Sequence, residues 1–243
     1  MKIFLLTGAG ISAESGIGTF RDRSGAGLWS RFDPMKLATP EAFAEHPEEV
    51  FAFYNFRRRT VIASEPNPAH FALARLESAM DERGHQFTLV TQNVDDLHER
   101  GGSRRVIHMH GEHLKARCTH CEAVNPWRRD MGARDRCPSC DHAGGLRPHV
   151  VWFGETPLHM DAILTALESA DRFVAIGTSG AVYPAAGFVA RARTLGIPTC
   201  EINLEPSDNA DMFSERRYGR ASETAPPWVD EMIVSLASRE GAR

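Results

Sequence analysis

The feature that most constrains the fold is a short apolar run that leads directly into a glycine-rich turn. Ile3–Leu6 is apolar, and residues 8–13 read GAGISA, which fits the pattern G-x-G-x-x-G/A. In this pattern a strand ends in a turn whose glycines let the backbone approach a pyrophosphate at a helix N-terminus. A glycine-rich turn without a ligand is the alternative, but its position after the first strand favours a dinucleotide site.

Short apolar runs alternate with helical patterns along most of the chain, which predicts an α/β fold with a parallel sheet covered by helices. We expect helices over 68–84, 184–196 and 227–237, because proline begins each segment and glycine ends the first two. The strands that we expect are Ile3–Leu6, Phe87–Val90, Val106–Met109, Val150–Phe153, Phe173–Ile176 and Thr199–Leu204.

Two stretches do not follow this alternation. Residues from about 22 to 65 read as a loop followed by helices that break at Pro47, and residues from about 114 to 145 are polar and carry cysteines. We expect both stretches to be insertions that together form a smaller second module.

Length and composition exclude several classes of protein. A chain of 243 residues with a formal net charge of −4 and no long basic run suits a globular protein that does not bind nucleic acid directly. No segment is apolar for long enough to span a bilayer or to form a signal-peptide core. We therefore expect a cytoplasmic protein without a membrane partner, whose five cysteines form no disulfides.

The cysteines carry the sharpest spacing signal. Cys118 and Cys121 form one C-x2-C pair, and Cys137 and Cys140 form a second after fifteen intervening residues. Two such pairs predict tetrahedral Zn²⁺ held by four thiolates, and a site closed by four protein ligands is structural. A redox pair is the alternative. Cys200 lies in an expected strand, so we expect it to be buried.

Polar residues crowd the end of the expected strand Phe87–Val90. Gln92, Asn93 and Asp95 follow it directly. An amide and a carboxylate together can bind a carboxamide, because they accept from its NH₂ group and donate to its oxygen. The simpler alternative is that Asn93 or Asp95 caps the short helix that follows.

Two histidines, His108 and His110, lie in the segment VIHMHGE at the end of another expected strand. A histidine in this position next to a nucleotide loop is a candidate general base, and a structural hydrogen-bonding role is the alternative. The spacing alone does not choose between the two.

An ordinary dehydrogenase is disfavoured. Its fingerprint needs an acidic residue at the end of a second strand about 20 residues after the glycines. That region here reads FRDRSGAGLWSRFDP, which has no strand pattern. Asn203 and Glu205 at a later strand end, and the Gly177-Thr178-Ser179 turn, are better candidates for binding ribose and phosphate, although helix capping is the alternative for the turn.

These motifs occur together in one known family. The segments GAGISAESGIGTFR, TQNVDDLH, HMHG, the two CxxC pairs, VVWFGE, GTS and NLE appear in the order found in sirtuins. The chain resembles this family of NAD-dependent protein lysine deacylases over nearly its whole length. GIGTFR differs from the common GIPDFR and resembles the bacterial class III branch.

The resemblance implies a Rossmann-like parallel sheet with helices on both faces and a small module. The NAD-binding domain would comprise 1–30, 66–113 and 146–243, and the small domain would combine the helical insertion 31–65 with the zinc ribbon 114–145. The residues that the resemblance assigns to the cofactor are Gly8, Ala9, Gly10, Ser12, Phe20, Arg21, Gln92, Asn93, Asp95, Gly177, Thr178, Ser179, Asn203, Glu205 and Ala221.

The resemblance also implies a reaction in which NAD⁺ is consumed. The acyl oxygen of an acylated lysine attacks the ribose carbon, nicotinamide leaves, and the products are free lysine and O-acyl-ADP-ribose. His110 would be the general base, and Asn93 and Asp95 would complete the catalytic set. The substrate peptide would pair with the segment VVWFGE, in which Val151, Trp152, Phe153 and Gly154 are the contacting residues.

The acyl group is indicated by Tyr54 and Arg57, which share one face of an expected helix. Class III sirtuins carry a Tyr-x-x-Arg motif that binds the carboxylate of succinyl- or malonyl-lysine, for which the planar guanidinium is suited. By spacing alone, a surface arginine beside a partly buried tyrosine is the simpler interpretation. The resemblance favours a desuccinylase and demalonylase that retains some deacetylase activity.

Three alternatives remain open at this point. A mono-ADP-ribosyltransferase would use the same NAD⁺ site with another acceptor. A zinc-ribbon module that binds protein or nucleic acid would leave the Rossmann-like part inactive, and a hydride-transfer dehydrogenase would reduce NAD⁺. We expect acylated proteins as partners and a monomeric chain.

Overall fold

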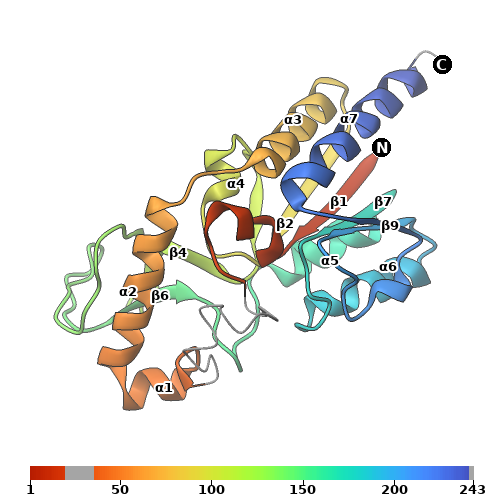
Figure 1. Ribbon diagram of the computed structural model, residues 1–243. Coiled ribbons are helices and arrows are strands. Elements are labelled where there is room, and N and C mark those ends of the chain that lie inside the picture. The colour runs from red at the N-terminus through yellow and green to blue at the C-terminus, as the bar shows by residue number, and fades with distance from the viewer. Residues whose placement is uncertain (20–35, 241–243) are drawn as a thin grey trace.

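The computed structural model describes residues 1–19 and 36–240, and the following account concerns these ranges. A six-stranded sheet with the strand order β3-β2-β1-β7-β8-β9 forms the larger part of the fold (Figure 1). All of its neighbouring strands pair in parallel. Its strands are β1 (Lys2–Thr7), β2 (Gln86–Thr91), β3 (Val106–His108), β7 (Arg172–Ile176), β8 (Thr199–Asn203) and β9 (Glu215–Tyr218).

The five strands predicted for this sheet are confirmed, and one strand was missed. The central strands β1 and β7 are apolar because helices cover both faces of the sheet, which is the pattern of a buried parallel strand. The missed strand, β9, reads ERRY and has an alternating half-exposed pattern. It lies at the edge of the sheet, where charged side chains are common.

The helices pack on the two faces of this sheet. On one face, α3 and α7 bury a cluster that includes Leu73 and the fully buried Trp228. On the opposite face, a cluster that includes Phe4 and Phe188 packs under α5 and α6. The bounds of these helices are α3 (Pro68–Glu82), α4 (Leu97–Arg100), α5 (Met160–Glu168), α6 (Phe188–Thr194) and α7 (Ala221–Glu240), with 3-10 turns at Ala9–Ile11, Ala13–Ser15, Ala185–Gly187 and Ala210–Met212.

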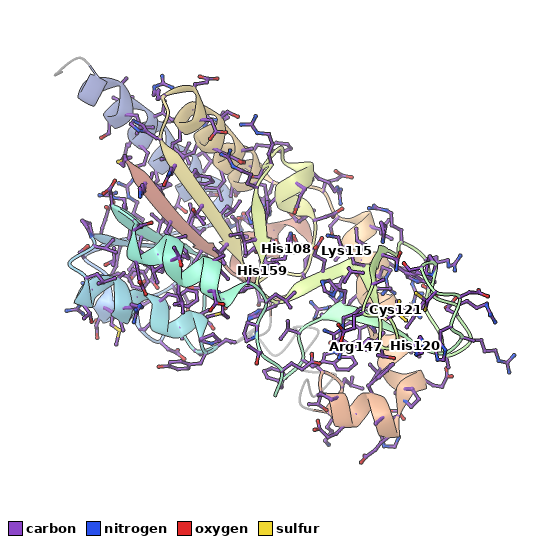
Figure 2. The ribbon with its side chains drawn as sticks, turned by 180° about the vertical axis from the view of Figure 1, so that it is seen from behind. His108, Lys115, His120, Cys121, Arg147 and His159 are labelled. Atoms are coloured by element: carbon purple, nitrogen blue, oxygen red, sulfur yellow. The ribbon has the colours of Figure 1, made fainter. Side chains whose placement is uncertain are left out.

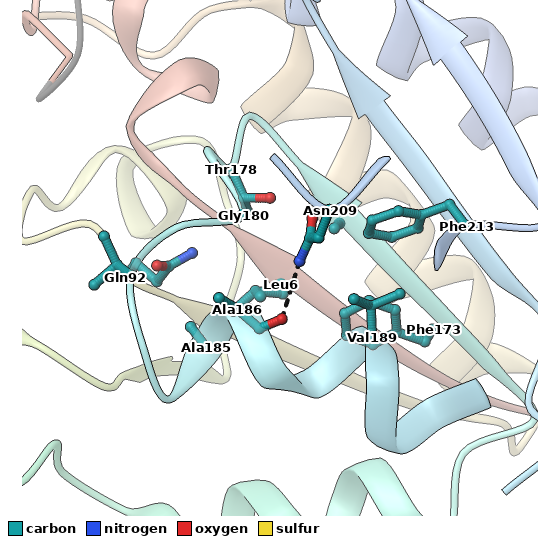
Figure 3. A pocket seen from close by; sticks show the side chains of 12 residues that line it. Leu6, Gln92, Phe173, Thr178, Gly180, Ala185, Ala186, Val189, Asn209 and Phe213 are labelled. Carbon is teal, nitrogen blue, oxygen red and sulfur yellow. Dashed lines mark hydrogen bonds between the residues drawn. The ribbon is translucent and has the colours of Figure 1, made fainter. Parts of the chain in front are cut away.

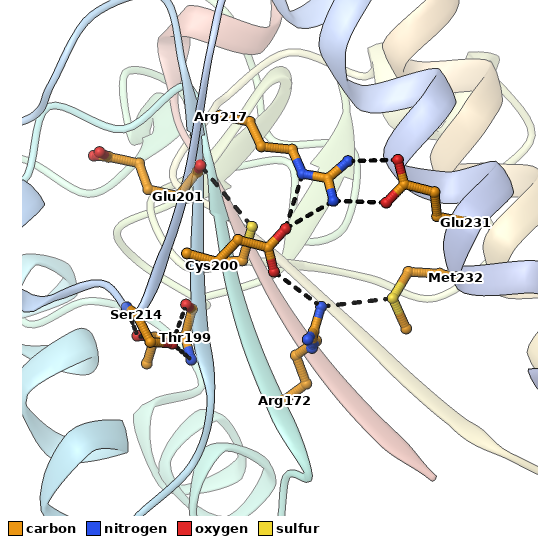
Figure 4. A network of polar contacts seen from close by, with 9 residues as sticks. Arg172, Thr199, Cys200, Glu201, Ser214, Arg217, Glu231 and Met232 are labelled. Carbon is orange, nitrogen blue, oxygen red and sulfur yellow. Dashed lines mark hydrogen bonds and ion pairs between the residues drawn. The ribbon is translucent and has the colours of Figure 1, made fainter. Parts of the chain in front are cut away.

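The C-terminal helix begins at Ala221 and not at Pro227, where the sequence predicted it. Its first turn is held by Glu14, whose carboxylate accepts from the backbone N–H and the hydroxyl of Ser222. Glu14 is distant from Ser222 in the sequence, so no local sequence pattern predicts that the helix begins at Ala221. Arg217 of β9 fixes the same helix further along, through bonds of 2.6 and 2.9 Å to Glu231 (Figure 4).

A second sheet of three antiparallel strands, in the order β5-β4-β6, lies apart from the first and packs against α2 (Figure 1). The predicted break at Pro47 is confirmed, because one helix ends at Glu45 and the next begins at Pro47. The elements of this part are α1 (Pro40–Glu45), α2 (Pro47–Ala63), β4 (Gly111–Cys118), β5 (Val124–Pro126) and β6 (Leu146–Val150).

The prediction of a strand over Val150–Phe153 is wrong. The strand is β6, and it ends at Val150. The apolar run that suggested a strand is buried for another reason: Trp152 is only 2 % exposed and packs in a cluster with residues of α1 and α2. Cys200, in contrast, is fully buried in the first sheet as expected, and burial raises the pKa of its thiol to about 12.

Within the described ranges, we found no helix with the length and apolar character needed to cross a lipid bilayer. The division of the chain into two domains at the predicted boundaries stays a prediction.

Candidate functional site

Most of the described residues that were predicted for the cofactor, together with His110, gather at one edge of the six-stranded sheet. They follow the carboxyl ends of β1, β2, β3, β7 and β8, which meet at the same edge because the strands are parallel. Strand β1 pairs with β2 on one side and with β7 on the other. The strand order therefore reverses at β1, because β2 and β3 lie on one side of it and β7, β8 and β9 on the other. Ligands of open α/β sheets bind in the crevice at such a switch point.

The glycine loop approaches the end of β7 very closely. The backbone N–H of Gly10 donates to the carbonyl of Gly177 at 2.9 Å, and a Cβ atom on Gly10 would lie 2.7 Å from the Gly177 Cα. A side chain at Gly10 is therefore excluded by the protein's own backbone. Gly8 and Ala9 lead into this contact. Phe20 and Arg21, also predicted to line the loop, lie outside the described residues.

Ser12 and Asn93 join the glycine loop to the segment after β2. The Asn93 amide donates to the Ser12 hydroxyl at 3.1 Å, and both side chains are buried. Gln92 lies beside them, with its backbone N–H bonded to the Thr7 carbonyl at 2.9 Å. The glycine loop and the polar segment after β2 are therefore joined by a hydrogen bond and form one connected surface.

Asp95 is buried beneath this surface, and burial raises the pKa of its carboxyl to about 6. Its carboxylate accepts from the backbone N–H of Leu97 at 3.2 Å at the start of α4. The N-cap of α4 is Asp96, whose side chain makes no capping bond, so Asp95 supports the start of the helix from the preceding position. This contact uses one carboxylate oxygen and is compatible with a second role.

The contacts in the structure distinguish His108 from His110, which the spacing in the sequence did not. His108 contacts the Asn93 carbonyl at 3.2 Å and the Glu99 carboxylate at 2.7 Å, so both of its ring nitrogens meet acceptors. Burial alone would lower the pKa of His108, but the bond to Glu99 raises it. His108 is therefore held as a charged partner of Glu99, which does not suit a general base.

His110 has the opposite arrangement. Its Nδ1 lies 3.1 Å from the Gln92 carbonyl oxygen. Since a carbonyl can only accept, Nδ1 carries the proton and Nε2 keeps its lone pair. Burial lowers the pKa of His110, so the ring is neutral at physiological pH. Gly111 follows in a left-handed conformation with φ of 81°, and any side chain there would clash with the His149 carbonyl.

The residues predicted to bind adenosine lie at the ends of β7 and β8. The Asn203 amide donates to the Thr178 carbonyl at 2.7 Å and so connects the two strand ends. Ser179 and Glu205 are exposed next to this bond. Ala221 is buried at the start of α7.

The four cysteines converge in the second sheet region. Their sulfur atoms all lie within 4.8 Å of one another, with Cys118–Cys140 at 3.8 Å and Cys121–Cys137 at 3.7 Å. Four thiolates about 2.3 Å from a tetrahedral zinc lie about 3.8 Å apart, so the cluster fits a structural zinc. Figure 2 shows Cys121 and His120 at the outer end of this region, far from His108.

Comparison with known proteins decides the family. The model of the Sir2 family matches residues 8–184, which span the glycine loop, both histidines and the four cysteines. The chain belongs to the Sir2 family.

Its relatives agree with this assignment. The chain is 57% identical over 236 residues to an NAD-dependent protein deacylase of Caulobacter vibrioides, covering 97% of this chain and 98% of the relative. It is 52% identical to an NAD-dependent protein deacylase of Salmonella typhimurium, covering 97% and 85%. A solved mutant of a Sir2 homologue in complex with ADP-ribose has a TM-score of 0.84 and 36% identity, covering 100% and 94%. The chain is therefore an NAD-dependent protein deacylase that acts on acylated proteins.

Tyr54 and Arg57 of this sirtuin are buried between α2 and the second sheet, and not exposed on the surface. The Tyr54 hydroxyl accepts from the indole N–H of Trp152 at 2.9 Å, and Nε of Arg57 donates to His113 Nε2 at 3.0 Å. Burial raises the pKa of Tyr54 to about 12, so this hydroxyl stays protonated. Because Trp152 donates to the Tyr54 oxygen, this bond does not use the Tyr54 O–H as a donor.

The segment predicted to pair with substrate is anchored from both sides. The N–H groups of Val151 and Phe153 donate to the carbonyls of His110 and Ala38, each at 2.9 Å. The N–H of Trp152 donates to a side-chain carboxylate at 2.8 Å. Phe153 is half-exposed, and Gly154 takes a φ of 89°.

Sequence reasoning missed two residues of this sirtuin that support the same region. Arg147 forms two bonds to Glu155, at 2.6 and 2.9 Å, and its guanidinium carbon lies 3.4 Å from the centre of the Trp152 ring. Arg147 is labelled in Figure 2. His113 is 1 % exposed and contacts Arg57. His113 and Leu114 are both buried where the register of β4 shifts, so regular strand alternation gave no signal for His113.

A small pocket lies on the other side of Gln92, between β1, β7 and the start of α6 (Figure 3). Its volume of about 10 Å³ has room for roughly one water. Most of its lining is apolar, and the Asn209 amide at its rim already donates to the Ala186 carbonyl at 2.9 Å. The pocket is part of the packing between the six-stranded sheet and α6.

Proposed function

We propose that this sirtuin removes succinyl and malonyl groups, as well as acetyl groups, from lysine side chains, with release of nicotinamide and O-acyl-ADP-ribose. The observation that carries the proposal is the buried pair Tyr54 and Arg57. Both side chains are buried on the same helix. A planar guanidinium can bind a carboxylate through two parallel hydrogen bonds, and a tyrosine hydroxyl adds a further donor. An acyl group that ends in a carboxylate fits this pair of donors.

The position of this pair supports the proposal. Tyr54 bonds to Trp152, which lies in the segment proposed for substrate pairing. Arg57 bonds to His113 on β4, the strand that begins directly after His110. An acyl-lysine that entered along 151–154 would therefore point its acyl end towards Tyr54 and Arg57. Since the N–H groups of 151–153 already have acceptors, the peptide would pair with their carbonyl groups.

The cofactor residues divide into two sets with different tasks. NAD⁺, when bound, supplies the ribose carbon that the acyl oxygen attacks and from which nicotinamide leaves. Ser12, Asn93 and Asp95 form a connected polar surface suited to the carboxamide and its ribose. His110 offers the lone pair of Nε2 as the general base that takes a proton from a ribose hydroxyl. Asn203, with the Gly177–Ser179 turn, faces the adenosine half.

The carboxylate-binding role predicts a selective defect. Replacing Arg57 with methionine is expected to lower kcat/KM for a succinyl-lysine peptide by about 10- to 100-fold, because a hydrogen bond to a charged group contributes about 1.5–3 kcal/mol. Turnover of the matched acetyl-lysine peptide is expected to change little. Both rates are followed by peptide mass with and without NAD⁺.

The matched control for this experiment is Arg59→Met on the same helix. Arg59 is exposed and paired only with Asp130 among the ion pairs of the described residues, so its loss is expected to leave both rates unchanged. Equal succinyl turnover in Arg57→Met and the native protein would show that Arg57 does not bind the carboxylate. Transfer of labelled ADP-ribose to protein without deacylation would instead favour the mono-ADP-ribosyltransferase.

The pKa shifts predict the pH dependence. His110 must be neutral to act as a base, and its pKa lies below the usual 6.5 because the ring is buried. Deacylation is therefore expected to be level above about pH 7 and to fall as the pH drops through the lowered pKa of His110. The raised pKa of Asp95, about 6, adds protonation of a second group to the same fall. A log plot of kcat/KM is expected to approach a slope of about two at low pH. A half-maximal rate above about pH 7 would contradict this assignment.

The cytoplasmic location and the monomeric state of this sirtuin stay predictions.

A further inference from the structure

His113 has a fixed place in the fold. Its backbone N–H donates to the Val94 carbonyl at 2.7 Å, and its carbonyl accepts from Nε of Arg58 at 3.0 Å. One bond ties β4 to the segment that carries Asn93 and Asp95, and the other ties β4 to α2. The imidazole is therefore positioned by backbone contacts on both sides before it touches Arg57.

The side chain of His113 makes a contact that only an acceptor can make. Nε of Arg57 is always a donor, so the His113 Nε2 that it meets at 3.0 Å must be unprotonated. The proton then resides on Nδ1, and within the described part of the chain this buried atom has no hydrogen-bond partner. A buried N–H without a partner costs stability, so an apolar residue would be the cheaper choice for packing alone.

The surroundings keep the imidazole neutral. Burial lowers the pKa of His113 well below 6.5, and the nearby charges of Arg57 and Arg58 lower it further. His113 therefore remains an acceptor throughout the range in which an NAD-dependent enzyme works. The Tyr54 ring lies 5.6 Å from the imidazole centre to centre, so the same histidine contacts both residues of the pair.

We propose that His113 is a positioning residue that selects the acyl group: it holds the Arg57 guanidinium by Nε so that the two terminal nitrogens face an acyl carboxylate. A planar guanidinium anchored at Nε keeps one orientation of its fork, and bidentate binding of a carboxylate depends on that orientation. This inference rests on the proposed desuccinylase function, because it assigns His113 to the same acyl site.

The test compares His113→Leu with His113→Gln. Leucine and glutamine have similar volumes, but only the glutamine side chain has an oxygen that can accept from Arg57. His113→Leu is expected to raise KM for the succinyl-lysine peptide about tenfold and to leave kcat and the acetyl-lysine constants within about twofold. His113→Gln is expected to restore most of the lost affinity. His149→Leu, at a half-exposed histidine on β6 of the same sheet, serves as the matched control.

The outcomes distinguish the positioning role of His113 from the carboxylate-binding role of Arg57. A selective rise in KM that glutamine reverses supports the inference. Equal losses on succinyl and acetyl peptides in His113→Leu, or no rescue by glutamine, would assign His113 to packing alone and overturn it, even where Arg57→Met confirms carboxylate binding. Absence of succinyl turnover in the native protein would overturn the proposed function and the inference with it.

Discussion

Replacing His110 with alanine is expected to lower the rate of NAD-dependent deacylation by about 10²- to 10⁴-fold, the range that a positioned general base contributes. The expectation rests on geometry. The Gln92 carbonyl fixes the proton on Nδ1, so Nε2 is the one ring nitrogen able to accept a proton. Alanine removes this acceptor and leaves the backbone carbonyl of residue 110, which anchors Val151, in place.

The measurement is single-turnover deacylation at saturating NAD⁺, with NAD⁺ affinity determined separately by calorimetry. His46→Ala is the matched control, because His46 is exposed at the junction of α1 and α2. His110→Ala is expected to bind NAD⁺ with an affinity close to that of the native protein. Retention of more than a tenth of the native rate would assign the base to another group.

Replacing Cys121 with serine is expected to abolish zinc binding and to unfold the three-stranded sheet. Cys121 is exposed, so the substitution removes a ligand without disturbing the packing. Structural zinc contributes about 10–16 kcal/mol in zinc-finger peptides, which matches or exceeds the total stability of a typical domain, about 5–15 kcal/mol. The buried Cys118 and Cys137 would then be left as unbound thiols in the core of this region.

The zinc content per chain and the thermal transition by circular dichroism measure this effect. Cys200→Ser is the control, because Cys200 is buried in the first sheet, away from the four-cysteine cluster. That variant is expected to lose some stability and to keep its zinc. A Cys121→Ser protein with a full complement of zinc and an unchanged melting temperature would contradict the metal assignment.

Loss of zinc is also expected to impair catalysis. The strand β4 begins at Gly111, directly after His110, and ends at the zinc ligand Cys118. It also carries His113, which contacts Arg57. Unfolding of the three-stranded sheet would therefore displace both the proposed general base and the proposed acyl site, because β4 connects them to the zinc cluster.

Much of the large sheet could be predicted because its strands are buried on both faces. Phe4 and Leu5 are fully buried against opposite helical layers, so β1 reads as an unbroken apolar run. β9 and the small sheet were missed for the converse reason, since edge strands and zinc-supported strands carry polar sequences. The run Val150–Phe153 was wrongly predicted as a strand, because apolar and aromatic residues that are buried by helices give the same sequence pattern as a buried strand.

The site could be predicted to the level of motifs and no further. Parallel strands bring Gly8, Asn93 and His110 to one edge, so their positions after expected strands were sufficient to group them. The spacing did not distinguish His108 from His110, and only the family resemblance assigned His110. The physical difference lies in their contacts with Glu99 and with the Gln92 carbonyl, which join separate elements. The contact of His113 with Arg57 joins a strand to a helix 56 positions away, and no local pattern specifies it.

The central position of β1 has a consequence for biosynthesis. Ile3 pairs with Phe87 on one side and with Arg172 on the other, so β1 is synthesised before either neighbour and waits for much of the chain before the second one exists. At a synthesis rate of about 5–20 residues per second, this interval is roughly ten to thirty seconds. During that time, at least one edge of this apolar strand is unpaired. A nascent chain of this kind is a natural client for a chaperone that shields extended apolar segments.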